Sequence, residues 1–463
     1  MESPIKVLFV DTPDPFSEVE HRFRPLWPAY LAAYARQYLD RQTVQFAFAS
    51  SALETALADF KPHIVGLSAV SQNYSRAIQY ARIAKAKGAQ VVMGGIHVSL
   101  LPHCLTEDMD IGCLGEGEIT FTELLKSFVQ AGSFSPDLLA SIAGIAYRQN
   151  GKQVITPPRP LCFPLDQLPH PDRSLTGYYK HDYMITSRGC PYRCAFCATS
   201  RYWDKVRFHS TAYVIRQIGE LIEHGAKVIT FYDDLFIADK KRFFEIAEGV
   251  MAMGLDRSIG FRCSCRANLV TPEIVSALKA MNVRSIWLGL ESGCERVLEY
   301  LKGSVTVENN RYAVKLLKDA GMETNGAFVI GSPDETEKEM METYAFIKKN
   351  RLDFIAVYVL TPLPGTPVWN YALKRGLVSD SMNWDLLNVN FETQPQSAII
   401  LSEVLTREQI IRIYKRFRRL RLFCVLRALP SSAFLHDFPA IAMRMLKEWI
   451  VRVVRRRSNP HIS

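Results

Sequence analysis

The sequence predicts an α/β protein in which an N-terminal doubly wound parallel sheet is followed by a partial (β/α)6 barrel and then by a C-terminal helical region. Strand-like stretches alternate with helical patterns over residues 5–130, and the same alternation recurs about six times over residues 181–375. A proline-rich stretch interrupts the pattern between these two regions. At 463 residues, the chain is long enough for two or three hydrophobic cores.

We place the domain boundaries where the pattern changes. The predicted segments are an N-terminal module over residues 1–143, a hairpin and proline-rich linker over 144–180, a barrel over 181–375 and a basic helical region over 376–463. The hairpin is predicted because Asn150-Gly151 separates two apolar stretches, and this dipeptide favours a two-residue hairpin turn.

Each element is predicted from a local pattern of apolar residues. The expected strands of the first module are 6–10, 44–48, 64–68, 90–93 and 111–114, and its expected helices are 28–39, 52–59, 74–87 and 119–131. The expected barrel strands are 184–187, 228–232, 259–264, 285–290, 325–330 and 354–360. Because ligands bind at the carboxyl ends of parallel strands, functional residues are expected directly after these segments.

The composition is that of an ordinary globular protein, with 48% hydrophobic and 22% charged residues. No apolar run approaches the roughly 18 to 20 residues that span a bilayer, and the first residues lack a signal-peptide pattern. The ten cysteines are therefore expected to be reduced thiols in a cytoplasmic protein.

The formal net charge of +9 is concentrated at the C-terminus. From Glu403 onward there are 14 Lys and Arg against 4 Asp and Glu, whereas residues 1–402 carry a net charge of −1. This distribution argues against a nucleic-acid partner for the protein as a whole. Apolar residues recur at helical spacing over residues 405–429 and 438–454.

The second of these stretches predicts a basic amphipathic helix. Its apolar face would consist of Met445, Leu446, Trp449, Ile450 and Val453. Such a helix can lie on an anionic membrane surface, which would place the protein peripherally at the inner membrane face. The alternative is a helical cap on the barrel with a solvated basic face.

The most informative motif is the triplet Cys190, Cys194 and Cys197. The spacing CxxxCxxC lets three thiolates bind three irons of a [4Fe–4S] cube, which leaves the fourth iron open for a small molecule. A zinc site would need a fourth ligand, but His209 and Cys263 stand at no recognised zinc spacing. A redox pair of Cys194 and Cys197 would leave Cys190 unexplained.

The triplet, with the aromatic residue Phe196 before its last cysteine, resembles the signature of the radical S-adenosylmethionine (SAM) enzymes. The resemblance implies that an open iron of the cluster binds SAM, with Phe196 beside it, and that an electron from the cluster cleaves SAM to a 5′-deoxyadenosyl radical. It also implies a partial TIM-type barrel and an electron donor such as flavodoxin or ferredoxin.

The resemblance further implies that the strand ends hold SAM. Asp233 and Asp234 follow the second barrel strand, where many radical SAM enzymes carry a Gly-Gly-Glu that binds the SAM amino group. Ser264 and Arg266 end the third strand, and Arg266 can pair with the SAM carboxylate. Glu291 ends the fourth strand and can accept hydrogen bonds from ribose. Each carboxylate can equally be a helix N-cap or a solvated acid.

The first module resembles the cobalamin-binding Rossmann-like domain. A Ser-x-Val turn at Ser68 precedes a Gly-Gly turn by 26 positions, and a Gly-Glu-Gly-Glu turn follows at residues 115–118. The cobalamin contacts that this resemblance implies are Ser68, Val70, Gly94, Gly95, His97, Glu116 and Gly117. The histidine-containing loop of that family is replaced by Asp-Thr-Pro-Asp-Pro-Phe at residues 11–16, so no histidine ligand is expected from it. Alternatively, these glycines serve only strand-to-helix turns.

The combined resemblance predicts a cobalamin-dependent radical SAM enzyme that methylates an unactivated carbon of a small-molecule or lipid-like substrate. The segment Thr-Pro-Leu-Pro-Gly-Thr-Pro at residues 361–367 is similar to one common in such enzymes. The alternative is a cyclase or rearrangement enzyme like the anaerobic porphyrin cyclases. An RNA methylthiotransferase is disfavoured because it would need three more cysteines in residues 1–150, which contain only Cys104 and Cys113.

Overall fold

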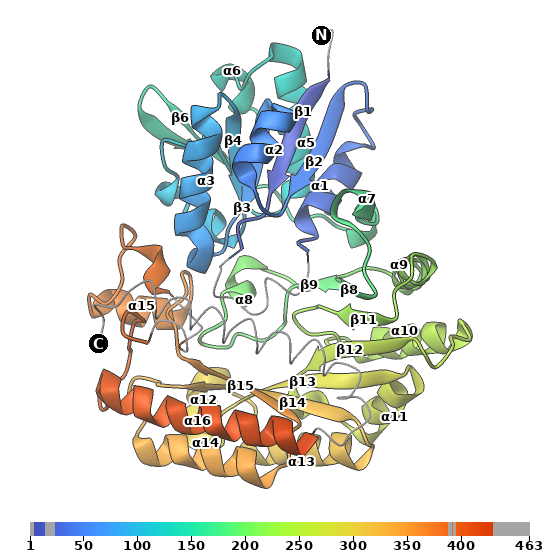
Figure 1. Ribbon diagram of the computed structural model, residues 1–463, viewed down its shortest axis with the longest axis vertical. Coiled ribbons are helices and arrows are strands. Elements are labelled where there is room, and N and C mark those ends of the chain that lie inside the picture. The colour runs from blue at the N-terminus through green and yellow to red at the C-terminus, as the bar shows by residue number, and fades with distance from the viewer. Residues whose placement is uncertain (1–3, 14–23, 388–390, 392–394, 429–463) are drawn as a thin grey trace.

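The computed structural model describes residues 4–13, 24–387, 391 and 395–428, and it contains two stacked α/β modules (Figure 1). The first module is built on a seven-stranded sheet with the order β2-β1-β3-β4-β5-β6-β7. Its strands are β1 (Ile5–Val10), β2 (Val44–Ala49), β3 (Ile64–Ser68), β4 (Gln90–Gly94), β5 (Ile111–Cys113), β6 (Ile145–Gln149) and β7 (Lys152–Ile155).

The first five strands are parallel, and helices cover both faces of the sheet. The core on one face includes residues of α1 (Trp27–Ala35) and α5 (Gly117–Ala131), and the core on the other includes residues of α2 (Leu53–Phe60) and α3 (Tyr74–Ala86). This arrangement is the predicted doubly wound sheet. The hairpin β6–β7 turns at Asn150-Gly151 as predicted, and it adds two antiparallel strands to the same sheet beside β5, with β7 at the edge.

The second module is a curved sheet of six parallel strands with the order β15-β14-β13-β12-β11-β8. The strands are β8 (His181–Met184), β11 (Val228–Phe231), β12 (Gly260–Cys265), β13 (Val283–Glu291), β14 (Glu323–Ile330) and β15 (Phe354–Val359). The helices among them are α9 (Thr211–Glu223), α10 (Lys240–Ala252), α11 (Pro272–Ala280), α12 (Glu295–Lys302), α13 (Val307–Asp319) and α14 (Glu337–Lys349). The predicted fold class is confirmed.

The first barrel strand differs from the prediction. It was expected at residues 184–187, but β8 ends at Met184, and Ser187–Arg188 forms a separate strand, β9, antiparallel to β10 (Arg207–Phe208). The physical reason is Asp233, whose carboxylate accepts hydrogen bonds from the backbone amides of Thr186 and Ser187 at 2.7 and 2.5 Å. These bonds pull the chain out of the sheet before the cysteines begin.

The two modules share a hydrophobic core. Tyr74 and His97 of the first module contact Trp384, which follows the barrel in sequence, with ring centroids 6.2 and 4.4 Å away. Trp384 also stacks on Trp369 of α15 (Pro367–Lys374) at 6.0 Å. Leu301 of α12 belongs to the same core. The modules are therefore joined by packed apolar side chains.

The C-terminal region is described only in part. The predicted helical stretch over residues 405–429 is α16 (Arg407–Ala428), which packs against β15 and α14. The predicted helix over residues 438–454, with Met445, Leu446, Trp449, Ile450 and Val453, lies outside the described residues. Within the part of the chain that is described, no helix has the length and apolarity needed to cross a membrane.

Replacing Trp384 with Ala should destabilise both modules together. The indole is only 5% exposed and contacts rings from both sides of the boundary, so its removal leaves a cavity that costs about 3–5 kcal/mol. Urea denaturation followed by circular dichroism should show one transition at a lower midpoint. Leu373→Ala on the exposed side of α15 is the control, with a change within about 0.5 kcal/mol. Unfolding of the barrel alone would contradict the shared core.

Candidate active site between the two modules

The three cysteines of the CxxxCxxC motif lie on the loop between β9 and α8 (Thr199–Tyr202). Cys190, Cys194 and Cys197 are free thiols of intermediate exposure, as a ligand set open to one side requires. Burial raises the pKa of Cys190 to about 11, so cluster assembly must displace a proton from it. No three His, Cys, Asp or Glu side chains among the described residues gather around one point as ligands of a single ion do. A [4Fe–4S] cube does not require such a gathering, because each cysteine binds a different iron of the cube.

Arg266 holds this loop against the barrel. Its guanidinium lies 3.5 Å from the Sγ of Cys194, donates to the carbonyl oxygens of Lys302 and Gly303 at 3.3 and 3.0 Å, and stacks on the ring of Tyr192 at 3.9 Å. Arg266 was predicted to pair with the SAM carboxylate; in this structure Nη1 faces Cys194, and Nη2 donates to the carbonyl groups of Lys302 and Gly303.

The two predicted aspartates occupy different environments. Asp233 is buried, and both of its carboxylate oxygens accept hydrogen bonds from Thr186 and Ser187, including the hydroxyls at 3.0 and 2.8 Å. Asp234 accepts the backbone amide of Gly189 at 3.2 Å and lines the cavity described below. Desolvation there raises the pKa of Asp234 to about 6. Of the two, Asp234 is the carboxylate placed to meet a ligand.

The other predicted SAM residues also lie on or near the barrel. Glu291 is buried, has a φ of +60°, and pairs with the Nζ of Lys302 at 3.3 Å. Burial raises its pKa although Lys302 opposes the shift. Ser264 is exposed between two buried cysteines of β12, which by strand alternation places it on the opposite face of the sheet from them. Phe196 packs against the core shared by the two modules.

A cavity of about 580 Å³ opens between the two modules, at the carboxyl ends of β1, β3, β4 and β5. Its walls include Ser68, Val70, Gly94, Gly95, Glu116 and Gly117, which are six of the seven residues predicted to contact cobalamin. From the barrel side, Tyr183, Ile185, Arg188, Tyr232 and Asp234 complete the walls. A second cavity of about 320 Å³ shares Trp27, Ser68, Val70 and Tyr232 with it. The cavity therefore adjoins the segment that leads into the cysteine loop.

Small residues keep the strand ends open for a ligand. A Cβ atom on Gly66 would lie 2.7 Å from the ring of Phe9, and one on Gly95 would lie 2.4 Å from the carbonyl oxygen of Ala69. Gly95 also has a φ of +99°, which side chains rarely adopt. Gly94 is different, because a Cβ there would meet only ordinary contacts. Gly66 and Gly95 are thus required by the protein's own packing. Because they also line the cavity with Gly94 and Ser68, they leave its wall without bulky side chains, which fits a group that approaches the backbone closely.

The histidine predicted to contact cobalamin lies elsewhere. His97 is fully buried, its Nδ1 lies 2.9 Å from the hydroxyl of Ser71, and its ring packs on Tyr74 at 3.7 Å. It is not among the residues that line either cavity. Desolvation lowers the pKa of His97 to about 3, so the imidazole is neutral. In this structure His97 is a packing residue.

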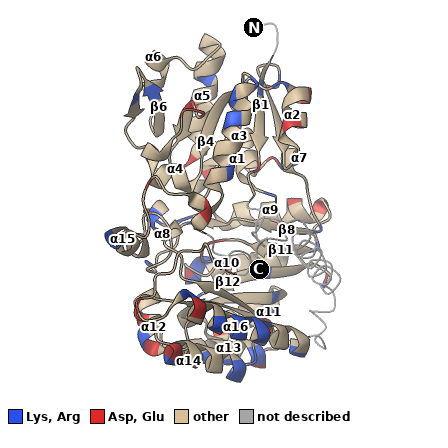
Figure 2. Cartoon of the chain, turned by 60° about the vertical axis from the view of Figure 1, so that its left-hand side comes forward, with Lys and Arg blue, Asp and Glu red and all other residues tan. Residues whose placement is uncertain are grey.

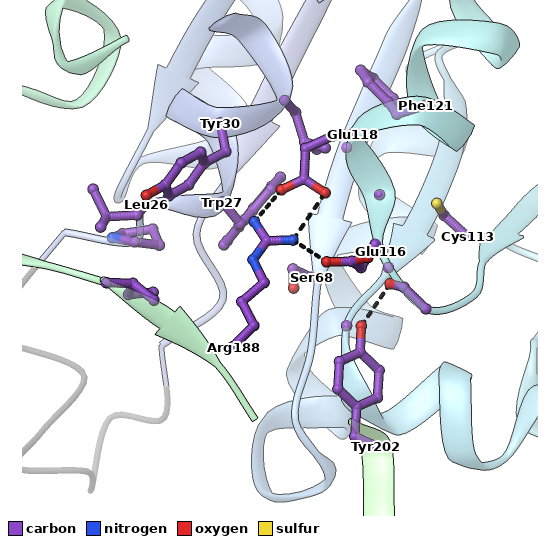
Figure 3. Close-up of a pocket in the computed structure, with 18 of the residues that line it drawn as sticks. Leu26, Trp27, Tyr30, Ser68, Cys113, Glu116, Glu118, Phe121, Arg188 and Tyr202 are labelled. Carbon is purple, nitrogen blue, oxygen red and sulfur yellow. Dashed lines mark hydrogen bonds and ion pairs between the residues drawn. The ribbon is translucent and has the colours of Figure 1, made fainter. Parts of the chain in front are cut away.

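Four charged residues form what we call the interdomain ion-pair network across the boundary between the modules: Glu116, Glu118, Arg188 and Arg207. Figure 3 shows the contacts among Glu116, Glu118 and Arg188. Arg188 lies 2.5 Å from an oxygen of each glutamate, and Arg207 lies 2.8 Å from Glu116. Burial would raise the pKa of Glu116, but Arg188 and Arg207 outweigh it and hold that pKa below its usual value. Both oxygens of Glu116 are thus engaged within the protein.

This network was missed by sequence reasoning. The signal was present in two places: a pair of acids at the start of α5, where the helix dipole favours negative charge, and an arginine two residues before Cys190. Nothing in the sequence pairs these two places, because they are separated by 70 residues or more.

Comparisons with known proteins agree with this geometry. Residues 184–347 match the model of the radical SAM superfamily, and residues 15–125 match that of the B12-binding domain. An uncharacterized methyltransferase of Pyrococcus horikoshii is 35% identical over 78% of this chain and 80% of its own length. The chain belongs to the cobalamin-dependent radical SAM enzymes. Its cofactors are SAM, a [4Fe–4S] cluster and cobalamin, as the sequence predicted.

Two further proteins have a similar sequence or fold. The anaerobic magnesium-protoporphyrin IX monomethyl ester cyclase of Rubrivivax gelatinosus is 27% identical over 75% of this chain and 66% of its own length. The radical SAM methyltransferase TsrM of Kitasatospora setae, solved with cobalamin and a [4Fe–4S] cluster bound, aligns with a TM-score of 0.68. That alignment covers 80% of this chain and 75% of TsrM at 18% identity, which shows a common fold.

Replacing His97 with Gln should flatten the pH dependence of stability and leave cobalamin affinity unchanged. The unfolded state binds a proton near pH 6.5, whereas folded His97 stays neutral down to about 3, so stability is lost as the pH falls below 6.5. Between pH 7.5 and 5.5 this group alone costs about 1.4 kcal/mol. Urea midpoints at both pH values, with aquacobalamin titrations, would test this. Weaker aquacobalamin binding by the variant would instead support the predicted contact between His97 and cobalamin.

Proposed function

We propose that this protein is a methyltransferase that acts on an unactivated carbon of a small-molecule or lipid-like substrate. The observation that carries the proposal is the joining of two sites into one: the segment that leads into the cysteine loop and the glycine-lined strand ends form walls of the same cavity. An iron–sulfur cluster held by the cysteine loop and a cobalamin held by the strand ends would then act on one substrate that lies between them.

The roles of the side chains follow from their positions. Cys190, Cys194 and Cys197 would hold the cluster, with the guanidinium of Arg266 beside the Sγ of Cys194. Ser68 and the glycines of β3 and β4 would receive the cobalamin nucleotide tail. When bound, these groups supply one-electron reduction of SAM, hydrogen abstraction from carbon and a methyl donor. No side chain needs to act as nucleophile or base, so the protein's task is to orient and to exclude water.

The walls of the cavity support an apolar substrate. Trp27, Tyr30, Tyr183 and Tyr232 supply aromatic surface, and Asp234 is a polar group on the barrel side. Aromatic walls exclude water and orient planar or hydrocarbon groups, while a small number of polar groups fix the direction of binding.

Ring cyclisation is the second candidate function, favoured by the similarity to the Rubrivivax cyclase. Formation of both methionine and S-adenosylhomocysteine, with methylated product, would distinguish methylation from cyclisation.

Two substitutions should each abolish the binding of one cofactor and leave the binding of the other intact. Cys194→Ser should abolish the cluster and leave aquacobalamin binding intact, because the cavity does not depend on that thiol. Gly94→Val should do the reverse, because a Cβ there meets only ordinary contacts, and a larger side chain on a residue that lines the cavity should take up part of its space. Iron and sulfide analysis with absorption spectra of the anaerobically reconstituted variants would check both. About four irons but no cobalamin binding in the unaltered protein would contradict methyl transfer as proposed.

Family membership implies a reductant and a small-molecule substrate. We propose flavodoxin or ferredoxin as the electron donor, because the cluster needs single electrons at low potential.

We also propose peripheral contact with an anionic membrane. The outer face of α16 exposes Arg412, Lys415, Arg418 and Arg419, and its last turns expose Leu422, Phe423 and Leu426. Figure 2 shows the basic positions of α16 in blue. Cations beside exposed apolar side chains are typical of interfacial helices.

Charge reversal on α16 should weaken binding to vesicles. Arg418→Glu with Arg419→Glu should lower co-sedimentation with phosphatidylglycerol-containing vesicles on the order of tenfold or more, since each cation near an anionic surface contributes about 1 kcal/mol. Lys240→Glu with Lys241→Glu makes the same charge change on exposed α10 and should have little effect. Co-sedimentation that survives both the α16 reversal and deletion of residues 438–463 would rule out this contact.

A further inference from the structure

The cysteine loop is fastened at both ends to one turn of the other module (Figure 3). Before the loop, the guanidinium of Arg188 lies 2.5 Å from Glu116 and from Glu118. After the loop, the hydroxyl of Tyr202 donates to the carbonyl oxygen of Gly115 at 2.6 Å. All three contacts end on the turn between β5 and α5. The loop can therefore move relative to this turn only by breaking contacts at one end or the other.

The contacts at the start of the loop are built to be rigid. The side chains of Arg188, Glu116 and Glu118 are 11%, 7% and 7% exposed, and the planar guanidinium binds two carboxylates at once. The same guanidinium lies near the rings of Tyr30 and Trp203, at 5.6 and 5.7 Å. Together with Arg207 the four charges balance, so no member can leave without stranding a buried charge.

The same turn also lines the cavity. All four residues of the Gly-Glu-Gly-Glu turn, 115–118, belong to its walls, and so does Arg188. On the barrel side Asp234 lines the cavity and accepts the amide of Gly189, one residue before Cys190. A molecule that fills the cavity therefore lies against Arg188 and against Asp234, the acceptor of the Gly189 amide, both within two residues or one hydrogen bond of the start of the cysteine loop.

We propose that the ion pairs of Arg188 with Glu116 and Glu118 couple occupancy of the cavity to ligand binding at the cysteine loop, with Arg188 as the positioning residue. The inference rests on the proposed sites for cluster and cobalamin. It follows that cobalamin in the cavity changes the affinity of the loop's cluster for SAM, and that SAM changes the affinity for cobalamin by the same factor.

The test compares SAM dissociation constants with and without saturating aquacobalamin, using protein reconstituted with its cluster under anaerobic conditions. The unaltered protein should show a ratio on the order of fivefold or more, and an aquacobalamin-dependent change in the electron paramagnetic resonance spectrum of the reduced cluster. Glu118→Gln removes one charge of the network and should bring the ratio toward one. Arg188→Lys keeps the positive charge but loses the planar guanidinium that binds both glutamates at once. The ratio of its two SAM dissociation constants should therefore lie between that of the unaltered protein and one.

The control is Asp353→Asn, which breaks an ion pair with Lys318 at the opposite end of the barrel and should lower stability without changing the ratio. A ratio of one in the unaltered protein, or a ratio that persists in Glu118→Gln, would overturn the coupling. Failure of the proposed function looks different: the reconstituted protein would then lack iron or would not bind aquacobalamin at all, and the ratio could not be measured.

Discussion

Four buried charges at the boundary between the modules constrain the rest of the structure. Glu116 and Glu118 stand at the start of α5, where the helix dipole favours them, and they face Arg188 and Arg207 from the paired strands β9 and β10. Buried ion pairs of this kind add little net stability but impose geometry strictly, because each charge needs its partner at a fixed place. The two modules can therefore dock in one way, and that docking defines the shape of the cavity.

Most polar side chains near the three cysteines are bonded to neighbouring backbone groups or to one another. Asp233 fixes Thr186 and Ser187, Arg266 fixes the carbonyl groups of Lys302 and Gly303, and Glu291 pairs with Lys302. Each of these side chains has a partner within the protein. A short loop that carries three thiols has few hydrogen bonds of its own, so its conformation must come from side chains outside it. The groups left for ligands are the partly exposed thiols, Asp234 and the open strand ends.

The sequence was sufficient for the fold and the cofactors because both depend on local patterns. Alternating strand and helix signals located ten of the eleven parallel strands closely; the first barrel strand overlaps its predicted range only at Met184. The cysteine spacing is specific to one chemistry. The roles of single residues were harder to predict. Ser68 and Gly94 line the cavity because strand ends gather by topology, whereas His97, three residues after Gly94, is buried against Ser71. Their contacts with cobalamin stay predictions. Arg188 was missed because its partners lie 70 residues or more away, and no periodicity encodes such a pairing.

The apolar core shared by the two modules has a consequence for how such chains can evolve. A domain can be exchanged freely between genes when its surface is polar on every side. Here Tyr74 and Val98 of the first module pack against Leu301, Trp369 and Trp384 of the second. A recombinant that joined this first module to an unrelated barrel would expose that surface to water. The two halves must therefore be inherited as a matched pair, and substitutions on one face select for compensating substitutions on the other.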